Sequence, residues 1–166
     1  MNPSALPPTE ERYFEDYPEG AVFEYGSVAV TAAEIVDFAR RFDPQPMHLD
    51  PAAAAQGPFG GLIASGWHTA ALMMRLFAEH FLSQVASLAS PGIDELRWLR
   101  PVRPGDALRI RVHVLEARPS RTQPDRGVLR TFVEVLNQED TAVMTLKPVN
   151  LLRRRPAAPS HASSRS

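Results

Sequence analysis

The chain has 166 residues, carries a formal net charge of −1 at pH 7 and contains no cysteine. Its length allows one domain with a buried core, and its 44% of hydrophobic residues is typical of a soluble globular protein. The near-neutral charge excludes a basic field that would hold nucleic acid, and the lack of cysteine excludes disulfide frameworks, thiolate metal sites and cysteine nucleophiles.

The two ends of the chain differ in composition from its middle. The start, MNPSALPPTEER, lacks the basic residues and apolar run of a secretory signal, and no stretch reaches the roughly 18 apolar residues of a membrane helix. We therefore expect a cytoplasmic protein with no membrane partner. Residues 1–11 and the Ala-, Ser- and Pro-rich residues 156–166 are expected to be disordered, which leaves a single domain at 12–155.

The first part of this domain predicts a strand and a short helix. Residues 22–30 are rich in aromatic and β-branched side chains, which is typical of a strand. Thr31 and Glu34 then form a capping box, the pattern that starts many helices. Apolar residues at helical spacing follow as far as Phe42, where the helix is expected to stop because Asp43 precedes a proline. Residues 50–55 predict a further helical turn.

The longest helical pattern runs from Trp67 to about Val85, a length of roughly 27 Å at 1.5 Å per residue. Apolar residues cover much of its circumference, so we expect it to be mostly buried. After Pro91-Gly92 the pattern changes to alternation, which predicts strands at residues 95–102, 107–116, 128–137 and 142–152. A buried helix followed by an antiparallel meander predicts an α+β fold with the sheet wrapped around that helix.

One short segment, Asp43-Pro44-Gln45-Pro46-Met47-His48, carries the strongest chemical signal. It places a carboxylate and an imidazole five positions apart on a backbone stiffened by two prolines. Further on, Gly66 stands at the start of the long helix, where backbone amides favour developing negative charge. An imidazole that titrates near neutrality suits acid/base chemistry. These features together indicate a site for chemistry on a polarised carbonyl.

The chain resembles the MaoC-like dehydratases, also called (R)-specific enoyl-CoA hydratases, over residues 13–155. Three landmarks carry the resemblance in order: the segment from Asp43 to Asp50; Phe59 with Ile63-Ala64 and Ser65-Gly66; and Pro101-Val102 with Gly105-Asp106. The resemblance implies the hot-dog fold and a homodimer or higher homo-oligomer. It also implies an acyl-CoA thioester as substrate, no metal, and no cofactor, since coenzyme A is part of the substrate.

The resemblance further implies a role for individual residues. Asp43 and His48 would activate the water that adds reversibly to a trans-2-enoyl-CoA to give an (R)-3-hydroxyacyl-CoA. The Gly66 amide would polarise the thioester during this reaction. The remaining substrate-binding candidates are Gln45, Ser65 and Trp67.

Three positions depart from the family pattern. Gln45 replaces the usual asparagine, and its extra methylene requires a rearrangement of the local hydrogen bonds. Ser65 replaces the histidine that normally precedes the glycine. Met74 stands where some hydratases carry a serine on the central helix, so the fine geometry of the acid/base pair is expected to differ here.

Simpler interpretations of the same residues stay open. An aspartate before a proline commonly starts a turn, which is all that Asp43 need do. His48 could form a surface pair with Asp50, and Gly66 could serve close packing alone. The competing functions are a hot-dog acyl-CoA thioesterase and a non-catalytic acyl-CoA-binding subunit.

The remaining histidines and a basic run are expected to lie outside the chemistry. His68 is expected in the core or an interface, whereas His80 and His113 are expected to be solvated. No two histidines have metal-ligand spacing on one element, which predicts no metal site. Residues 153–155, three arginines, could contact coenzyme A phosphates or form the solvated end of a strand.

Overall fold

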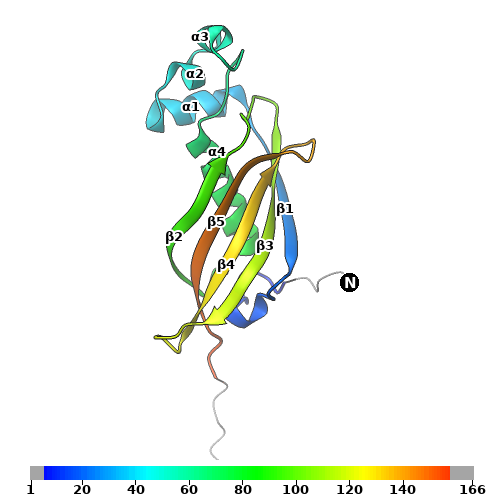
Figure 1. Cartoon of the computed structure of the whole chain (residues 1–166), viewed down its shortest axis with the longest axis vertical. Helices are drawn as coiled ribbons and strands as arrows, with labels where there is room; N and C mark the ends of the chain where they lie inside the picture. Colours follow the sequence, from blue (N-terminus) through cyan, green and yellow to red (C-terminus); the bar gives the residue numbers. More distant parts are fainter. Residues whose placement is uncertain (1–5, 158–166) are drawn as a thin grey trace, which may run out of the picture.

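A five-stranded antiparallel sheet wraps around one central helix in the computed structural model, which describes residues 6–157 (Figure 1). The strands lie in the order β1-β3-β4-β5-β2. Their bounds are β1 Val22–Ala29, β2 Ser87–Trp98, β3 Ala107–Pro119, β4 Arg126–Leu136 and β5 Ala142–Arg153. The α+β hot-dog fold expected from the sequence is confirmed.

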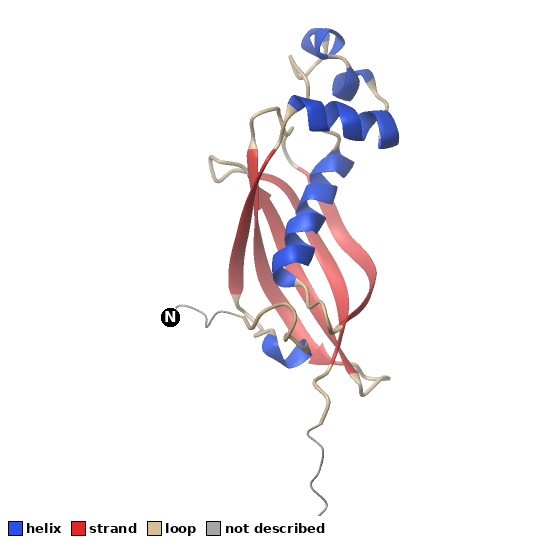
Figure 2. Ribbon diagram, turned by 180° about the vertical axis from the view of Figure 1, so that it is seen from behind, coloured by secondary structure: helices blue, strands red, loops and turns tan. Residues whose placement is uncertain are grey.

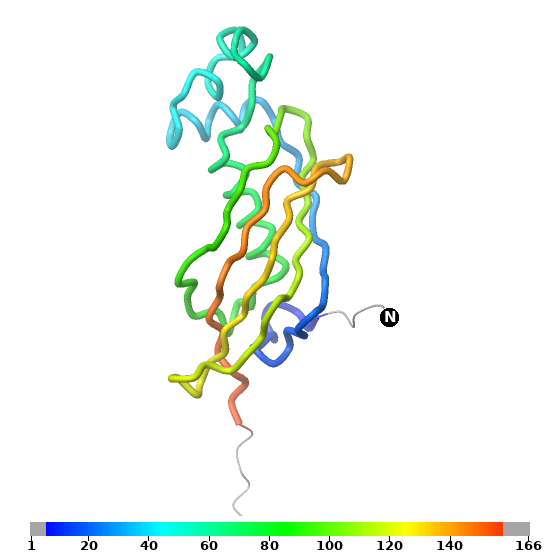
Figure 3. The backbone as a smooth tube through the Cα atoms, viewed as in Figure 1, coloured from blue at the N-terminus to red at the C-terminus, as the bar shows by residue number. Residues whose placement is uncertain are grey.

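The helices fall into a central helix and a small group at one end of the sheet. Their bounds are η1 Phe14–Asp16, α1 Ala32–Phe42, α2 Pro46–Leu49, α3 Pro51–Gln56, α4 Gly66–Leu76 and the π-helical turn η2 Phe77–Phe81. Residues 31–65 leave the sheet after β1, form α1, α2 and α3 beyond its end, and return at the start of α4 (Figure 3). This excursion brings the motif segment next to the first turn of α4.

The predicted capping box begins α1. The Glu34 amide donates to the Thr31 hydroxyl at 3.2 Å, and the Thr31 amide donates to the Glu34 carboxylate at 3.1 Å. The helix ends at Phe42, as the Asp43-Pro44 pair predicts. The sequence did not predict α2, although Pro46 is its first residue, a position where the missing amide of proline is harmless.

The central helix is shorter than predicted and does not reach Val85. Its last turn is π-helical and ends at Phe81, whose carbonyl accepts from the Arg12 guanidinium at 2.6 Å and from the Tyr17 hydroxyl at 2.9 Å. The Ser83 hydroxyl then accepts from the Val85 amide, which closes a turn instead of continuing the helix. Side-chain donors far away in the sequence therefore end the helix.

The first strand after α4 also differs from its predicted bounds. It was expected at 95–102, but β2 begins at Ser87, runs through Pro91 and ends at Trp98. Proline is tolerated because β2 is an edge strand, paired only with β5 and with three register irregularities. Residues 99–102 leave the sheet, and the Leu99 amide donates to the Val143 carbonyl at 2.8 Å.

The core lies between the concave face of the sheet and α4 (Figure 2). Alternate residues of β3 point inward and are buried, and they pack in one cluster with Phe77 and Phe81 of η2. The opposite face of the central helix is less buried than predicted, because Trp67 is 58% and Met74 is 44% exposed. The helix is thus covered by this chain's sheet on one side only.

The packed part of the chain begins earlier than the predicted domain boundary at residue 12. Thr9 is buried, and its carbonyl accepts from the Gln84 amide at 2.9 Å. Leu6 packs against the core. The other predicted tail segments, 1–5 and 158–166, lie outside the described residues. None of the helices in residues 6–157 has the length and apolar character needed to cross a membrane.

Candidate active site

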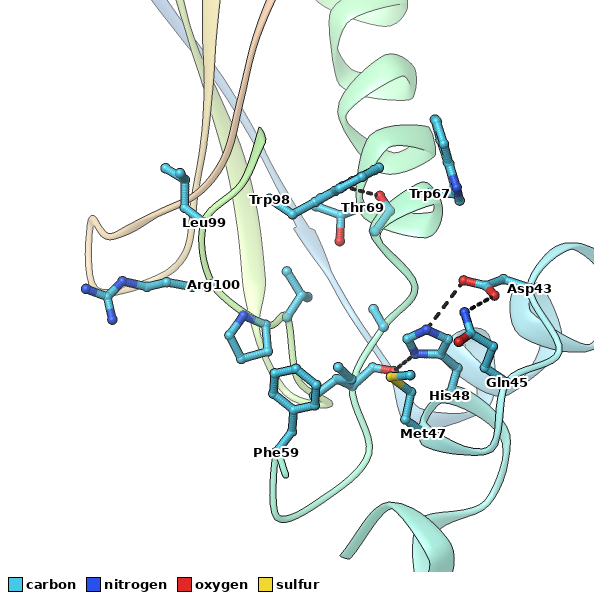
Figure 4. Close-up of a pocket in the computed structure, with 15 residues that line it drawn as sticks. Asp43, Gln45, Met47, His48, Phe59, Trp67, Thr69, Trp98, Leu99 and Arg100 are labelled. Carbon is cyan, nitrogen blue, oxygen red and sulfur yellow. Dashed lines mark hydrogen bonds and ion pairs between the residues drawn. The ribbon is translucent and has the colours of Figure 1, made fainter. Parts of the chain in front are cut away.

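A cavity of about 420 Å³ opens where the motif segment, the first turn of α4 and the end of β2 meet (Figure 4). Asp43, Gln45 and His48 line one side of it, and Gly66 and Thr69 of α4 line another. Its apolar walls are formed by Met47, Phe59, Ile63, Ala64, Trp67, Trp98, Leu99, Pro101 and Val102. The cavity is therefore mainly apolar with a few polar groups, as expected for a small-molecule site.

The geometry of His48 fixes the proton on its imidazole ring. The residue lies on α2, is 5% exposed, and its Nδ1 is 2.8 Å from the Ile63 carbonyl oxygen. A carbonyl only accepts, so Nδ1 carries the hydrogen and Nε2 of the neutral ring keeps a free lone pair. A surface pair with Asp50 is excluded, since Asp50 instead caps α3 by accepting from the Ala52 amide at 2.9 Å.

Asp43 faces the free nitrogen of this ring. Its Oδ2 lies 3.4 Å from His48 Nε2 (Figure 4). The same oxygen accepts from the Ser65 hydroxyl at 2.6 Å, and Oδ1 accepts from the Gln45 amide nitrogen at 2.7 Å. The hydrogen bond from Ser65, and secondly that from Gln45, lower the pKa of the Asp43 carboxyl below its usual value of 3.8. Asp43 is therefore ionised at neutral pH.

The pair presents two hydrogen-bond acceptors, a carboxylate oxygen and an imidazole lone pair, on one side of the cavity. Neither can donate to the other in these protonation states. A molecule with two O–H groups can donate to both, and the imidazole can then take a proton. The arrangement is therefore suited to binding and deprotonating water.

Gly66 is the first residue of α4, so its amide has no acceptor within the helix. Ser65 is the N-cap, and its hydroxyl accepts from the Trp67 amide at 3.2 Å. A Cβ atom at Gly66 would lie 2.5 Å from a ring carbon of Trp98, which only glycine avoids. Close packing does require this glycine, but Gly66 also lines the cavity, so the two interpretations are compatible.

The structure brings most of the predicted site residues together. Asp43, Gln45, His48, Gly66 and Trp67 all line the same cavity. The sixth candidate, Ser65, is fully buried behind Asp43 and forms no part of the cavity wall. Its observed contacts are with the carboxylate and the first turn of the helix.

Sequence reasoning missed four of the cavity residues, namely Thr69, Trp98, Leu99 and Arg100. Thr69 lies one turn after Ser65, so helical spacing does place it on the face that carries Gly66. Trp98 reaches the cavity from the end of β2, and nothing in the local sequence indicates this. Its indole Nε1 donates to the Gly66 carbonyl at 2.8 Å, across 32 positions of the chain.

The other singled-out side chains lie elsewhere. Met74 is exposed and does not line the cavity. His68 is in the core as expected, stacked on Phe38 with ring centroids 4.8 Å apart, and burial lowers its pKa. His80 is exposed, and His113 is half-buried beside Glu134 on the outer face of the sheet. Among residues 6–157, no three histidine, aspartate or glutamate side chains are grouped to hold a metal.

The arginine run at the end of β5 forms ion pairs with the N-terminal part of the domain. Arg154 lies 3.2 Å from the Glu15 carboxylate and Arg155 lies 2.6 Å from the Asp16 carboxylate. These contacts are at the end of the sheet opposite to α1, α2 and α3 (Figure 1). Within one chain, these arginines lie at the solvated end of β5 and not at the cavity.

Comparison with known proteins identifies the family. The model of the MaoC like domain matches residues 15–135. The chain belongs to this family. A 3-hydroxybutyryl-CoA dehydratase of Methylorubrum extorquens is 33% identical over 117 residues, which are 70% of this chain and 72% of that protein. The expected resemblance to MaoC-like dehydratases is therefore confirmed.

Solved structures of MaoC-like proteins share the fold described above. A MaoC-like dehydratase from Rhodospirillum rubrum has a TM-score of 0.81 and 41% identity, and the match covers 87% of this chain and 99% of that one. The R-hydratase PhaJ1 of Pseudomonas aeruginosa has a TM-score of 0.67 and 27% identity, with 86% of each chain covered. The family thus includes hydratases and dehydratases, which supports a hydratase-type enzyme in broad terms.

Proposed function

We propose that this MaoC-like protein is an acyl-CoA hydratase/dehydratase. It reversibly adds water to a trans-2-enoyl-CoA and gives an (R)-3-hydroxyacyl-CoA. The observation that carries the proposal is the acceptor pair of Asp43 Oδ2 and His48 Nε2, 3.4 Å apart in a cavity that Gly66 also lines. The names of the Methylorubrum dehydratase and the Pseudomonas R-hydratase support the same reaction class.

The proposed reaction begins with one water that donates to both acceptors. Its oxygen forms a bond to the β carbon while His48 Nε2 takes one of its protons and Asp43 holds the other. The electron pair of the carbon–carbon double bond moves toward the thioester oxygen. The proton that His48 took is then delivered to the α carbon on the same face, and the proton near Asp43 stays on the oxygen as the hydrogen of the new hydroxyl, so atoms and charge balance. Such a positioned acid/base group contributes roughly 10²- to 10⁴-fold in rate.

The developing enolate charge falls on the thioester oxygen. In the proposed pose this oxygen accepts from the Gly66 amide, which has no acceptor within its own helix. The positive end of the α4 dipole adds to this stabilisation. A single donor of this kind is worth on the order of 3 kcal/mol. The reaction as proposed uses no metal or other cofactor, since coenzyme A belongs to the substrate.

A thioesterase is the less favoured alternative, because hot-dog thioesterases usually place a carboxylate on the central helix. The single acidic residue between Gly66 and Phe81 is Glu79. It lies in η2, at the far end of the helix from the cavity, and forms an ion pair with Arg75 at 3.1 Å. Asp43 supplies the carboxylate of the cavity instead, and its partner is an imidazole.

The homodimer also remains a proposal. Apolar side chains are exposed together along the edge strand and the open face of α4: Ile93 is 50%, Trp98 46%, Leu99 50% and Trp67 58% exposed. Edge strands and exposed apolar patches are commonly covered by a second copy. Sedimentation at micromolar concentration should give a dimer, and a monomer would contradict this part of the proposal.

The activity is tested by mixing the protein with crotonyl-CoA and longer trans-2-enoyl-CoAs and following the loss of the conjugated enoyl absorbance. Asp43→Asn and His48→Ala should each lower kcat by at least about 100-fold. His113→Ala is the matched control, because it removes a second histidine–carboxylate pair, 2.8 Å from Glu134, on the outer face of the sheet. A thiol reagent in parallel detects hydrolysis. Absence of hydration over the whole acyl series would refute the proposed function.

A further inference from the structure

Trp98 contacts the proposed site in two ways. It is the last residue of β2, and its indole Nε1 donates to the Gly66 carbonyl at 2.8 Å. Its ring also lies directly against Gly66, where an added Cβ would meet three of its atoms at 2.5–2.8 Å. The first residue of α4 is therefore held by both a hydrogen bond and a close contact from the sheet.

The hydrogen bond from Trp98 is the first in a continuous series that ends at the carboxylate. The Gly66 carbonyl belongs to the same peptide group as the Trp67 amide, and that amide donates to the Ser65 hydroxyl at 3.2 Å. The Ser65 hydroxyl donates to Asp43 Oδ2 at 2.6 Å. Every donor in the series points the same way, from the indole toward the carboxylate.

Hydrogen bonds in such a series strengthen one another. A donor on the carbonyl oxygen withdraws electrons from the peptide and makes its N–H a better donor. That N–H in turn makes the hydroxyl it binds a better donor to the carboxylate. The indole therefore acts on the acid/base pair although it touches neither of its members.

We propose that Trp98 is a positioning residue: its indole N–H holds the first peptide of α4, so that Ser65 keeps its hydroxyl on the Asp43 carboxylate. The inference rests on the proposed hydratase function for its kinetic consequences, but the hydrogen-bond series is independent of any substrate. The indole supplies no proton to the reaction. It fixes the orientation of the peptide group on which both the helix cap and the carboxylate contact depend.

The position of Trp98 in the sheet makes this restraint firm. Trp98 pairs with Met144 of β5, which is fully buried, and the next residue, Leu99, donates its amide to Val143. The indole is thus attached to the sheet, whereas Asp43, just after α1, and His48 in α2 belong to the excursion beyond it. The series is one structural link from β5 through β2 and α4 to the carboxylate.

The test compares Trp98→Phe, which keeps an aromatic ring but loses the N–H, with Ser65→Ala and the double variant. Loss of one hydrogen bond predicts a kcat decrease between about 2- and 10-fold for Trp98→Phe, with KM within about twofold. The Asp43 carboxyl should titrate at a higher pH, since the contact that stabilises its ionised form is weaker. The double variant should be no worse than Ser65→Ala alone, because both changes interrupt one series.

Two results would overturn the inference. One is a Trp98→Phe enzyme with an unchanged kcat and an unchanged titration of Asp43, which would mean that the ring only fills space. The other is a double variant whose fold-decrease in kcat equals the product of the two single decreases, which would mean that the two residues act separately. Thermal unfolding of each variant checks that the fold is retained.

A readout without substrate separates this inference from the proposed function. The titration of the Asp43 carboxyl carbon, followed by NMR in ¹³C-labelled protein, should shift to higher pH in Trp98→Phe. If this shift occurs but no enoyl-CoA is hydrated, the positioning role stands and the proposed reaction fails. If hydration is observed and the titration is unchanged, the reaction stands and the positioning role fails.

Discussion

Ser65→Ala is the substitution whose consequences the structure defines most completely. The hydroxyl has two contacts: it donates to Asp43 at 2.6 Å and accepts from the Trp67 amide as the N-cap of α4 at 3.2 Å. Loss of an N-cap costs about 1 kcal/mol, and loss of a donor to a carboxylate costs roughly a further 1–2 kcal/mol. We expect a total loss of about 2–3 kcal/mol, or a Tm decrease of roughly 4–12 °C for a chain of this size.

The pH dependence of this loss has a definite sign. The hydrogen bond from Ser65 is the largest cause of the lowered pKa of Asp43 in the native protein. A group with a lowered native pKa stabilises the fold above its ordinary pKa, here 3.8, and the stabilisation disappears as the pH falls through the lowered value. The part of the stability loss in Ser65→Ala that comes from the contact with Asp43 should therefore be complete at pH 7 and absent in strong acid.

The assay is urea unfolding of wild type and Ser65→Ala between neutral and acid pH, combined with the titration of the Asp43 carboxyl carbon followed by NMR. Thr31→Ala is the matched control, since it removes the N-cap of α1, where the hydroxyl accepts from the Glu34 amide at 3.2 Å. The control should lose about 1 kcal/mol and keep the wild-type titration of Asp43. An Asp43 titration that is unchanged in Ser65→Ala would refute the reasoning that links this hydroxyl to the carboxylate.

Further predictions follow from the cavity. Gly66→Ala should displace the Trp98 indole and lower kcat by at least about 10-fold. If the displaced ring causes this loss, the double variant Gly66→Ala/Trp98→Ala should be no less active than Gly66→Ala alone. Thr69 is 2% exposed and lines the cavity, so its hydroxyl is a candidate contact for the substrate; Thr69→Val, of equal size, should lower kcat/KM by about 2- to 10-fold, measured against enoyl-CoA. Both tryptophans of the chain line the cavity, so saturating 3-hydroxyacyl-CoA should change the intrinsic fluorescence, and an unchanged spectrum would place the ligand elsewhere.

The sequence predicted those parts of the fold that local patterns determine. Alternation of apolar residues located β3, β4 and β5 to within a few residues, because inward positions such as Ile110 must be buried. The capping box and the proline after Asp43 located both ends of α1. These signals act over a few positions and need no knowledge of the rest of the chain.

The errors arose where distant residues decide the local structure. The end of the central helix depends on Arg12 and Tyr17, more than sixty positions before Phe81. The start of β2 depends on its being an edge strand, which alone makes Pro91 acceptable. Contacts with distant parts of the chain therefore determine the end of the central helix and the start of β2, and both differ from the positions that the local sequence pattern predicted.

The same limit applies to the candidate site. Asp43, His48 and Gly66, which the family resemblance indicated, all line one cavity. The resemblance did not indicate that Ser65 donates to Asp43 across 22 positions, or that Trp98 reaches Gly66 across 32. Neither contact has a local signal, because each joins elements that meet only in the folded chain.

The buried Arg12 has a consequence for the order in which the molecule is built. Its side chain is 4% exposed, and its guanidinium donates to the carbonyls of Pro7, His80 and Phe81, with no carboxylate within ion-pair distance among residues 6–157. During synthesis the ribosome delivers Arg12 long before Phe81 emerges, so the guanidinium has to remain in water until the central helix is finished. The segment around Arg12 is thus synthesised before the central helix, but it can pack against the end of that helix only after Phe81 has been made.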